Sequence, residues 1–208
     1  MTKTRKLRLG VLISGGGRTL MNLHQLIQDG RLSAQIAVVV ASRNCRGVPL
    51  AYQAGLNVHT VPYRQVPDAA TYSRKITDLL DAAGVELVVM AGFLSLWQIP
   101  PQYAGKVINI HPALLPAFGG HGMYGHHVHE AVLSHGCKIS GCTVHFVTNE
   151  YDQGPILLQK AVPVLEGDTP DTLAARVFEQ ETLALPEAIQ LLADGRVQVE
   201  GRVVHIAP

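Results

Sequence analysis

The chain has 208 residues, of which 47% are hydrophobic and 16% are charged, and its formal net charge is +1. These values predict one globular domain with a substantial core and exclude a disordered chain. The balanced charge also excludes a broad basic surface for nucleic acid or membrane lipids. No apolar run is long enough to cross a bilayer or to form a signal-peptide core. The three cysteines form no CxxC pattern, which indicates reduced thiols and a cytoplasmic protein.

The first half of the chain alternates short apolar runs with helical patterns. Runs rich in Val, Ile and Leu predict strands over Leu7–Ile13, Gln35–Ala41, Asn57–Val61, Leu87–Ala91 and Lys106–Ile110. Helical periodicity, followed in each case by a glycine, predicts helices over Thr19–Asp29, Pro49–Ala54 and Ala69–Ala83. This alternation predicts βαβ units, and therefore an α/β fold with a mostly parallel central sheet and helices on both faces.

The second half has a different pattern, which begins after Pro116. A loop rich in Gly and His, from Phe118 to His127, leads into a helix that ends near His135. Two longer strands follow, over Ser140–Val147 and Ile156–Val164. A helix begins at Thr169-Pro170 and runs to about residue 194. A terminal hairpin follows, with strands over Val197–Val199 and Val203–Ile206. We therefore expect an antiparallel C-terminal portion within the same single domain.

Asn109 and His111 stand two residues apart at the end of the last predicted parallel strand. Residues two apart in a strand point to the same face, and open α/β sheets bind ligands at the carboxyl ends of their strands. An amide donor beside an imidazole suits acyl transfer, in which a carbonyl oxygen becomes an oxyanion. Asp152, in a loop after the strand that contains Thr143 and His145, is the best candidate to face the imidazole. A carboxylate there would raise the pKa of His111, so that the ring carries a proton near neutral pH.

A second candidate site is the glycine-rich loop from Ser14 to Thr19, between the first strand and the first helix. Backbone N–H groups and a helix N-terminus at this place bind phosphate in α/β folds. Leu20 stands where a dinucleotide fingerprint has its third glycine, and Ser42-Arg43 stands where it has an acidic residue. A single phosphate held by Gly17, Arg18 and Thr19 therefore fits better than a pyrophosphate. A turn that merely needs glycine is the alternative interpretation.

The sequence gives no pattern for a metal site or for a nucleophilic hydrolase. Ten histidines include a cluster from His121 to His135, but no H-E-x-x-H or cysteine pattern completes a site, and we expect no metal. No G-x-S-x-G elbow is present for a serine nucleophile, and no base can be assigned to a cysteine nucleophile.

Several motifs occur together in the order, and at nearly the spacing, of a known family. They are Ile13-Ser14-Gly15, Ala91-Gly92-Phe93, Asn109-Ile110-His111-Pro112, Leu114-Leu115-Pro116, Thr143-Val144-His145-Phe146-Val147 and Asp152-x-Gly154-Pro155. On these motifs the chain resembles the phosphoribosylglycinamide formyltransferase family, folate-dependent enzymes of purine synthesis, over almost its whole length. The resemblance implies one Rossmann-like formyltransferase domain over residues 1–208. Its phosphate-binding half would end near residue 105, and its folate-binding and catalytic half would begin near residue 106.

The resemblance also implies a reaction and a set of site residues. A formyl group would pass from 10-formyltetrahydrofolate to the amine of phosphoribosylglycinamide, without a metal. Carried over by position, the catalytic residues are Asn109, His111 and Asp152, and Asn109 also contacts the folate. The phosphoribosyl substrate would be held by Gly17, Arg18, Thr19 and Glu181, and the pterin by Leu94, Ser95, Leu96 and Trp97. The implied partners are these small molecules, with no nucleic acid or membrane, and the protein would be a monomer or a homodimer.

Other functions remain open at this point. A formyltetrahydrofolate hydrolase would use water as the acceptor; that enzyme carries an extra N-terminal domain, which we do not expect here because the chain begins directly with its first strand. A methionyl-tRNA formyltransferase would need a C-terminal tRNA-binding domain and a more basic surface. An NADP-binding reductase would rest only on the glycine loop and Ser42-Arg43. A non-catalytic folate- or nucleotide-binding module would leave Asn109, His111 and Asp152 unexplained.

Overall fold

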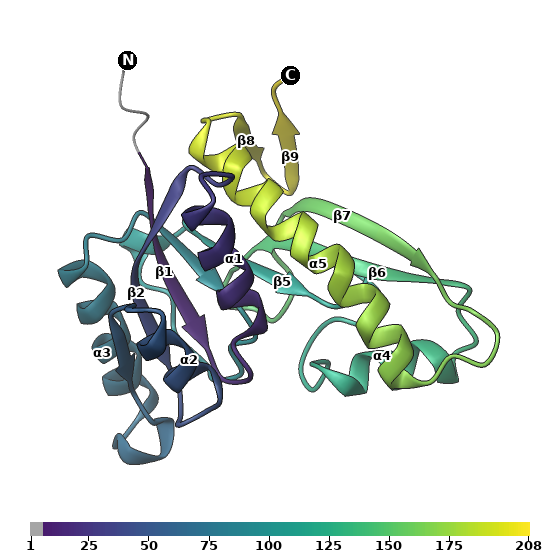
Figure 1. The fold of residues 1–208 in the computed structure, drawn as a ribbon, viewed down its shortest axis with the longest axis horizontal. Helices are drawn as coiled ribbons and strands as arrows, with labels where there is room; N and C mark the ends of the chain where they lie inside the picture. Colours follow the sequence, from purple (N-terminus) through teal and green to yellow (C-terminus); the bar gives the residue numbers. More distant parts are fainter. Residues whose placement is uncertain (1–5) are drawn as a thin grey trace. The chain divides into compact units, whose positions relative to one another are not determined.

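The computed structural model describes residues 6–208, which alternate between strands and helices in the first half of the chain (Figure 1). In chain order the elements are β1 (Leu7–Ile13), α1 (Arg18–Gln28), β2 (Ala34–Ala41), α2 (Gly47–Gln53), β3 (Val58–Thr60), η1 (Tyr63–Gln65), α3 (Ala69–Ala82), β4 (Leu87–Met90), η2 (Pro101–Tyr103), β5 (Val107–His111), α4 (His126–Ser134), β6 (Ile139–Phe146), β7 (Ile156–Pro163), α5 (Pro170–Ala193), β8 (Val197–Glu200) and β9 (Val203–Ile206).

The strands β1 to β7 form one hydrogen-bonded sheet in the order β3-β2-β1-β4-β5-β6-β7, and β8 and β9 form a separate hairpin. The chain divides into two compact units within β5: the first ends at Ile108 and the second begins at Asn109. The residues that carry the candidate chemistry are thus divided between the units, with the glycine loop in the first and Asn109, His111 and Asp152 in the second.

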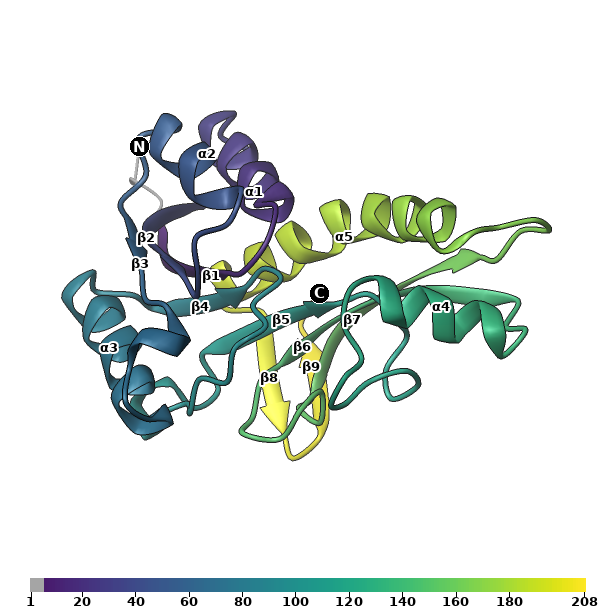
Figure 2. The ribbon, with the colours of Figure 1, turned by 90° about the horizontal axis from the view of Figure 1, so that it is seen from below.

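The first unit is a parallel α/β arrangement. β1 pairs in parallel with β2 on one side and β4 on the other, and β2 pairs in parallel with β3. Most residues at the carboxyl ends of β1 and β2 are fully buried, as expected for strands covered on both faces. Figure 2 shows α1 and α2 on one side of these strands and α3 on the other. Right-handed crossovers require this division, because the chain runs outward from β1 to β3 and then returns to β4.

The second unit is built on the antiparallel pair of β6 and β7, over which α5 lies (Figure 1). α5 begins where the sequence predicts a helix start. The Thr169 side chain accepts a hydrogen bond from the Thr172 backbone N–H, the Thr172 hydroxyl accepts one from the Thr169 backbone N–H, and Pro170 occupies the first turn. Asp168, just before the helix, binds both terminal nitrogens of Arg176 two turns later, at 2.6 and 2.8 Å.

The predicted fold class is confirmed, and the strands and helices agree with the predicted ranges to within about two residues. The short 3₁₀ turns η1 and η2 were not predicted, because turns of three residues carry no periodicity that a sequence pattern can show. Among residues 6–208, no helix is both long enough and apolar enough to cross a membrane.

Candidate active site

Two of the last three residues of β5, Asn109 and His111, carry polar side chains. Asn109 is half-buried, and His111 is 3% exposed. The intervening Ile110 is buried, and the alternation of the strand points it to the opposite face from the two polar side chains. The pair predicted from the sequence therefore lies at one strand terminus, within the second unit.

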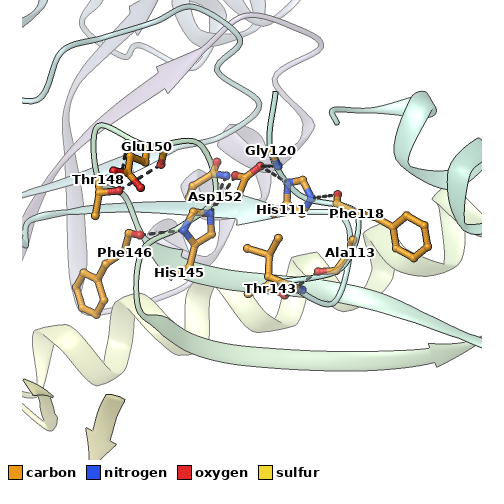
Figure 3. A network of polar contacts seen from close by, with 12 residues as sticks. His111, Ala113, Phe118, Gly120, Thr143, His145, Phe146, Thr148, Glu150 and Asp152 are labelled. Carbon is orange, nitrogen blue, oxygen red and sulfur yellow. Dashed lines mark hydrogen bonds and ion pairs between the residues drawn. The ribbon is translucent and has the colours of Figure 1, made fainter. Parts of the chain in front are cut away.

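Both ring nitrogens of His111 face hydrogen-bond acceptors (Figure 3). Nε2 lies 2.8 Å from the carbonyl oxygen of Phe118, and Nδ1 lies 3.7 Å from Oδ2 of Asp152. A carbonyl oxygen only accepts, so Nε2 carries a hydrogen in this arrangement. The imidazolium is the form in which both nitrogens can donate to the groups that they face.

The pKa of His111 nevertheless lies below the ordinary value of 6.5. Burial of the ring is the largest cause, and it outweighs the raising effects of the Asp152 carboxylate and the Phe118 carbonyl. The carboxylate raises the pKa as expected from the sequence, but burial outweighs it, so the expectation of a raised pKa and a protonated ring near neutral pH is wrong. A carboxylate at 3.7 Å compensates only part of the lost hydration, so the protonated ring is a stronger acid than an ordinary histidine.

Asp152 reaches the site from a closed loop between β6 and β7. The Phe146 N–H donates to the Pro155 carbonyl at 2.9 Å, which joins the two ends of the loop. A Cβ at Gly154 would collide with the carbonyl oxygen of Phe146, so only glycine fits at this neck. Asp152 itself has a φ of 54°, a left-handed conformation that Asp and Asn tolerate better than most residues. Two residues of the motif, Asp152 and Gly154, thus each have a structural reason.

The Asp152 carboxylate contacts several groups. Oδ2 accepts the Gly120 N–H at 2.8 Å and faces His111, and Oδ1 lies 3.5 Å from Nε2 of His145. Contacts with these hydrogen-bond donors and with the two histidines hold the pKa of Asp152 below its usual value, although burial raises it. A Cβ at Gly119 would approach Cβ of Asp152 to 3.2 Å, so glycine there lets the Gly120 N–H come close. Asp152 is therefore ionised at neutral pH.

His145 completes this cluster, and no role was predicted for it from the sequence. Its ring is 1% exposed, its Nδ1 lies 2.9 Å from the Phe146 carbonyl oxygen, and its Nε2 lies 3.3 Å from Nδ2 of Asn109. Thr143, two residues earlier, is also polar and buried on β6 (Figure 3). Two polar residues two apart in the apolar second half of a strand are a signal that could have identified them.

Thr143 fixes the segment that follows His111. Its hydroxyl donates to the Ala113 carbonyl at 2.6 Å and accepts the Leu115 N–H at 3.0 Å. Gln159 on β7 donates to the Thr143 hydroxyl at 3.0 Å and to the Leu115 carbonyl at 2.9 Å. The backbone between His111 and the Gly/His-rich loop is therefore held by two side chains of the β6–β7 pair.

In the first unit, the glycine loop leaves the first turn of α1 without a side-chain cap. Gly17 is the N-cap residue with a φ of 75°, and no side chain accepts a hydrogen bond there. A Cβ on Gly17 would lie 2.7 Å from Cα of Gly47, and Gly47 N–H donates to the Gly15 carbonyl at 3.0 Å. The close approach of the two backbones therefore requires glycine, which supports the alternative interpretation that this turn merely needs glycine. The first turn holds no acidic residue, and Arg18 and Thr19 open the helix, so it also suits an anion.

A buried serine pair joins this loop to the segment after β4. The hydroxyl groups of Ser14 and Ser42 lie 2.6 Å apart, and the Leu94 N–H donates to the Ser14 hydroxyl at 2.9 Å. Nε of Arg43 donates to the Ser14 carbonyl at 2.7 Å, so one face of this exposed side chain is fixed beside the loop. The elements predicted to hold the phosphate and the pterin are therefore connected within one unit.

The predicted pterin-lining segment has side chains in two environments. Leu94 is 51% exposed and Leu96 is 40% exposed, whereas Trp97 is 3% exposed. The Trp97 indole donates to the Thr77 hydroxyl at 3.3 Å and packs edge-on against Tyr103. Of these residues, the leucines are accessible to a ligand, and Trp97 belongs to the core of the first unit.

Glu181, the residue predicted to hold the ribose or glycinamide, lies half-buried on α5 in the second unit. It is close enough to the Cys142 thiol on β6 to add to the effect of burial, and the pKa of that thiol rises to about 12. Cys142 is therefore an inert thiol.

In the described part of the chain, no group of three or more His, Cys, Asp or Glu residues is arranged to hold a metal ion. The histidines of the Gly/His-rich loop contact aromatic rings and carboxylates: His121 packs against Tyr151, and His127 lies 3.4 Å from a carboxylate oxygen of Glu130.

Comparisons with known proteins agree with this arrangement of motifs. The family described as Formyl transferase matches residues 7–189. The chain is 37% identical to the phosphoribosylglycinamide formyltransferase of Arabidopsis thaliana, over 93% of this chain and 68% of that protein. It is 35% identical to the phosphoribosylglycinamide formyltransferase of Escherichia coli, over 91% of this chain and 88% of that protein. A longer relative, the trifunctional purine biosynthetic protein adenosine-3 of Gallus gallus, is 38% identical, and the chain spans 19% of it.

Solved structures give the same grouping. The glycinamide ribonucleotide transformylase 1 of Symbiobacterium toebii matches with a TM-score of 0.91 and 40% identity, over 99% of this chain and 96% of that one. A formyltetrahydrofolate deformylase of Pseudomonas syringae matches with a TM-score of 0.86 and 25% identity, over 98% of this chain and 66% of that one.

Proposed function

Because this chain belongs to the formyl transferase family, we propose that it transfers the formyl group of 10-formyltetrahydrofolate to the amine of phosphoribosylglycinamide. The observation that carries the proposal is the cluster at the end of β5, where an amide and an imidazole lie beside an ionised carboxylate. The relatives that match most of the chain bear the name of this activity. Cytoplasmic localisation stays a prediction.

In the proposed reaction, the substrate amine attacks the formyl carbon and the formyl oxygen becomes an oxyanion. The Asn109 amide and the protonated form of the His111 ring stabilise this charge. Because burial lowers the pKa of His111, less than half of the molecules carry that form at pH 7. Nε2–H of His111 donates to the Phe118 carbonyl in the present arrangement, so the oxyanion must share or replace that acceptor. Asp152 provides the negative charge that the imidazolium needs and accepts the proton lost by the amine, directly or through water. The bond from the formyl carbon to the folate nitrogen then breaks, and that nitrogen takes up a proton.

The remaining predicted residues bind the two substrates. Gly17, Arg18 and Thr19 hold the phosphate through backbone N–H groups and a positive charge, and Glu181 holds the ribose or the glycinamide. Leu94 and Leu96 provide exposed apolar surface for the pterin, and the backbone of Ser95 lies between them. The amine is itself the nucleophile, so the rate depends largely on how both substrates are placed, and no covalent enzyme intermediate is needed.

Incubation with 10-formyltetrahydrofolate in the presence and absence of phosphoribosylglycinamide tests this proposal. We expect consumption of the folate only with the amine, together with formation of formylated product. Consumption of the folate at the same rate with and without the amine would support the second candidate, a formyltetrahydrofolate hydrolase. The similarity to the deformylase of Pseudomonas syringae is the reason to test this candidate. A nicotinamide cofactor that copurifies with the protein would instead support a reductase.

The role of His111 is tested by His111→Ala. We expect turnover to fall by about 10²-fold or more, because one stabilising group of the oxyanion is removed. Binding of phosphoribosylglycinamide, measured by calorimetry, should be nearly unchanged. Turnover like that of the unaltered protein would remove His111 from the mechanism.

A further inference from the structure

His145 is the buried titratable group of the site that the proposed reaction does not use. Its exposed fraction is 1%, Nδ1 faces one carbonyl oxygen, and Nε2 lies between Nδ2 of Asn109 and, slightly farther away, Oδ1 of Asp152. Nδ1 lies 2.9 Å from the Phe146 carbonyl oxygen, and Nε2 lies 3.3 Å from Nδ2 of Asn109. Figure 3 shows the ring between the Phe146 carbonyl and Asp152.

The Phe146 carbonyl determines the tautomer of His145. A carbonyl oxygen accepts only, so Nδ1 must carry a hydrogen to bind it. In the neutral ring Nε2 then has a lone pair and accepts, and the group that it faces on Asn109 must be a donor. Since only the NH₂ end of a carboxamide donates, the orientation of Asn109 follows from the position of a backbone carbonyl on β6.

His111 and His145 compete for one negative charge. Asp152 faces His111 through Oδ2 and His145 through Oδ1, and a second buried imidazolium would have no counter-charge. Both nitrogens of His111 face acceptors only, whereas Nε2 of His145 faces the Asn109 donor at 3.3 Å, nearer than the Asp152 carboxylate at 3.5 Å. When the cluster binds one proton, these contacts therefore favour that proton on His111 rather than on His145.

We propose that His145, as the neutral Nδ1–H tautomer, is a positioning residue that holds the Asn109 carboxamide with its NH₂ group toward the developing oxyanion. One hydrogen of this NH₂ group binds Nε2 of His145, and the other is left for the formyl oxygen. The role of the second hydrogen in binding the formyl oxygen rests on the proposed function. The tautomer of His145 does not depend on that function.

The orientation matters because the two ends of a carboxamide have opposite effects on an anion. A hydrogen on Nε2 of His145 would donate to Oδ1 of Asp152, only 3.5 Å away, and would favour the opposite orientation of Asn109. The carbonyl oxygen of Asn109 would then face the oxyanion and repel it. The tautomer of a residue that touches no substrate thus decides whether Asn109 aids the reaction.

The tautomer is tested by ¹⁵N NMR on the full protein labelled at its histidine ring nitrogens. At pH 7 we expect a pyrrole-type Nδ1 and a pyridine-type Nε2 for His145, assigned by the signals that His145→Phe removes. An imidazolium or an Nε2–H tautomer would overturn the proposal. This measurement needs no turnover, so it remains decisive even if the protein does not formylate phosphoribosylglycinamide.

The action through Asn109 is tested by a double-mutant cycle. His145→Phe keeps a ring but removes the acceptor, and we expect kcat to fall about 10- to 100-fold with little change in the KM for phosphoribosylglycinamide. His145→Gln, whose carbonyl oxygen can accept from Asn109, should restore part of the loss. In an Asn109→Ala background, His145→Phe should lower kcat by less than about threefold, because the group that it positions is gone.

The controls distinguish positioning from damage to the strand. Val144→Ala removes buried apolar volume from the same strand and should lower stability without a comparable fall in kcat. Multiplicative losses in the cycle would show that His145 acts independently of Asn109 and would overturn the proposal. Failure of the Gln variant to recover any of the loss, with its fold intact, would do the same.

Discussion

Asp152 is the residue on which the charges of the site depend, because one carboxylate faces two imidazoles and accepts one backbone N–H. Asp152→Asn keeps a similar shape and suits the φ of 54°, so we expect the fold to be retained. The His111 imidazolium would lose its counter-charge, its pKa would fall further, and kcat should fall by about 10²-fold. Steady-state kinetics check this, together with titration of His111 by NMR.

Asp168→Asn is the matched control, because Asp168 also has a lowered pKa but binds Arg176 and Thr172. That substitution should lower stability and leave kcat nearly unchanged. If Asp152→Asn and Asp168→Asn lowered kcat equally, Asp152 would not act as the counter-charge of His111 in the reaction.

The side chains of the site were predictable only in part. Spacing and strand alternation brought Asn109 and His111 to one terminus, but the sequence did not show that Phe118 turns its carbonyl toward His111. That contact depends on a loop in which Phe118 has a positive φ, and a sequence pattern does not report such a conformation. The direction of the His111 pKa was wrong for a related reason: proximity of a carboxylate is easy to infer from motifs, whereas the degree of burial is not.

Among the secondary-structure elements, the start of α1 offers a clear test. Gly17→Ala would force a side chain into a φ of 75° and place its Cβ 2.7 Å from Gly47. We expect a loss of stability of about 1 kcal/mol or more and a displaced first turn. A loss of about 1.4 kcal/mol of binding energy would raise the KM for phosphoribosylglycinamide about tenfold, with a smaller change in kcat. Gly16→Ala is the control, since a Cβ there meets nothing within 4 Å. Equal KM values for the two variants would contradict phosphate binding at this turn.

The segment after β4 tests the distinction between pterin contact and core. Leu96→Ser alters a side chain that is 40% exposed and should raise the KM for 10-formyltetrahydrofolate with a change in stability within about 0.5 kcal/mol. Trp97→Ala removes a buried indole that packs against Tyr103 and should cost about 3–5 kcal/mol of stability. Urea denaturation and folate saturation curves separate the two effects. A large loss of stability in Leu96→Ser would contradict its place at the surface.

Elements were predicted better than the contacts between them. The glycines after α1, α2 and α3 adopt the positive φ that ends a helix, so the ends of these helices could be predicted from local sequence. The position of Trp97 could not be predicted in this way, because its partner Thr77 lies on a different element and is 20 residues away. A run of mixed apolar residues is compatible with both a pocket wall and a core.

Folding lowers the pKa of several acids and histidines across the chain. Each of these shifts makes the free energy of unfolding fall as the pH falls. For a histidine with a lowered pKa, the unfolded chain takes up a proton near pH 6.5 while the folded chain does not. The free energy of unfolding therefore falls as the pH drops below about 6.5. Asp68, Asp152 and Asp168 extend the loss as the pH falls past their ordinary value of 3.8. His111, His129 and Asp152 all lie in the second unit, so acid should weaken that unit first.

His129 allows this to be tested without touching the proposed catalytic residues. It is 4% exposed on α4, its Nδ1 has no hydrogen-bond partner in the described structure, and burial lowers its pKa. His129→Leu should reduce the difference in unfolding free energy between pH 7 and pH 5, by about 1.4 kcal/mol for each unit by which folding lowers that pKa. Urea denaturation followed by circular dichroism at both pH values measures the difference. Val128→Ala, a buried neighbour on the same helix, should lower stability equally at both. If His129→Leu kept the full pH dependence of the unaltered protein, the acid sensitivity would have to come from other groups, because a leucine cannot bind the proton that the unfolded histidine takes up.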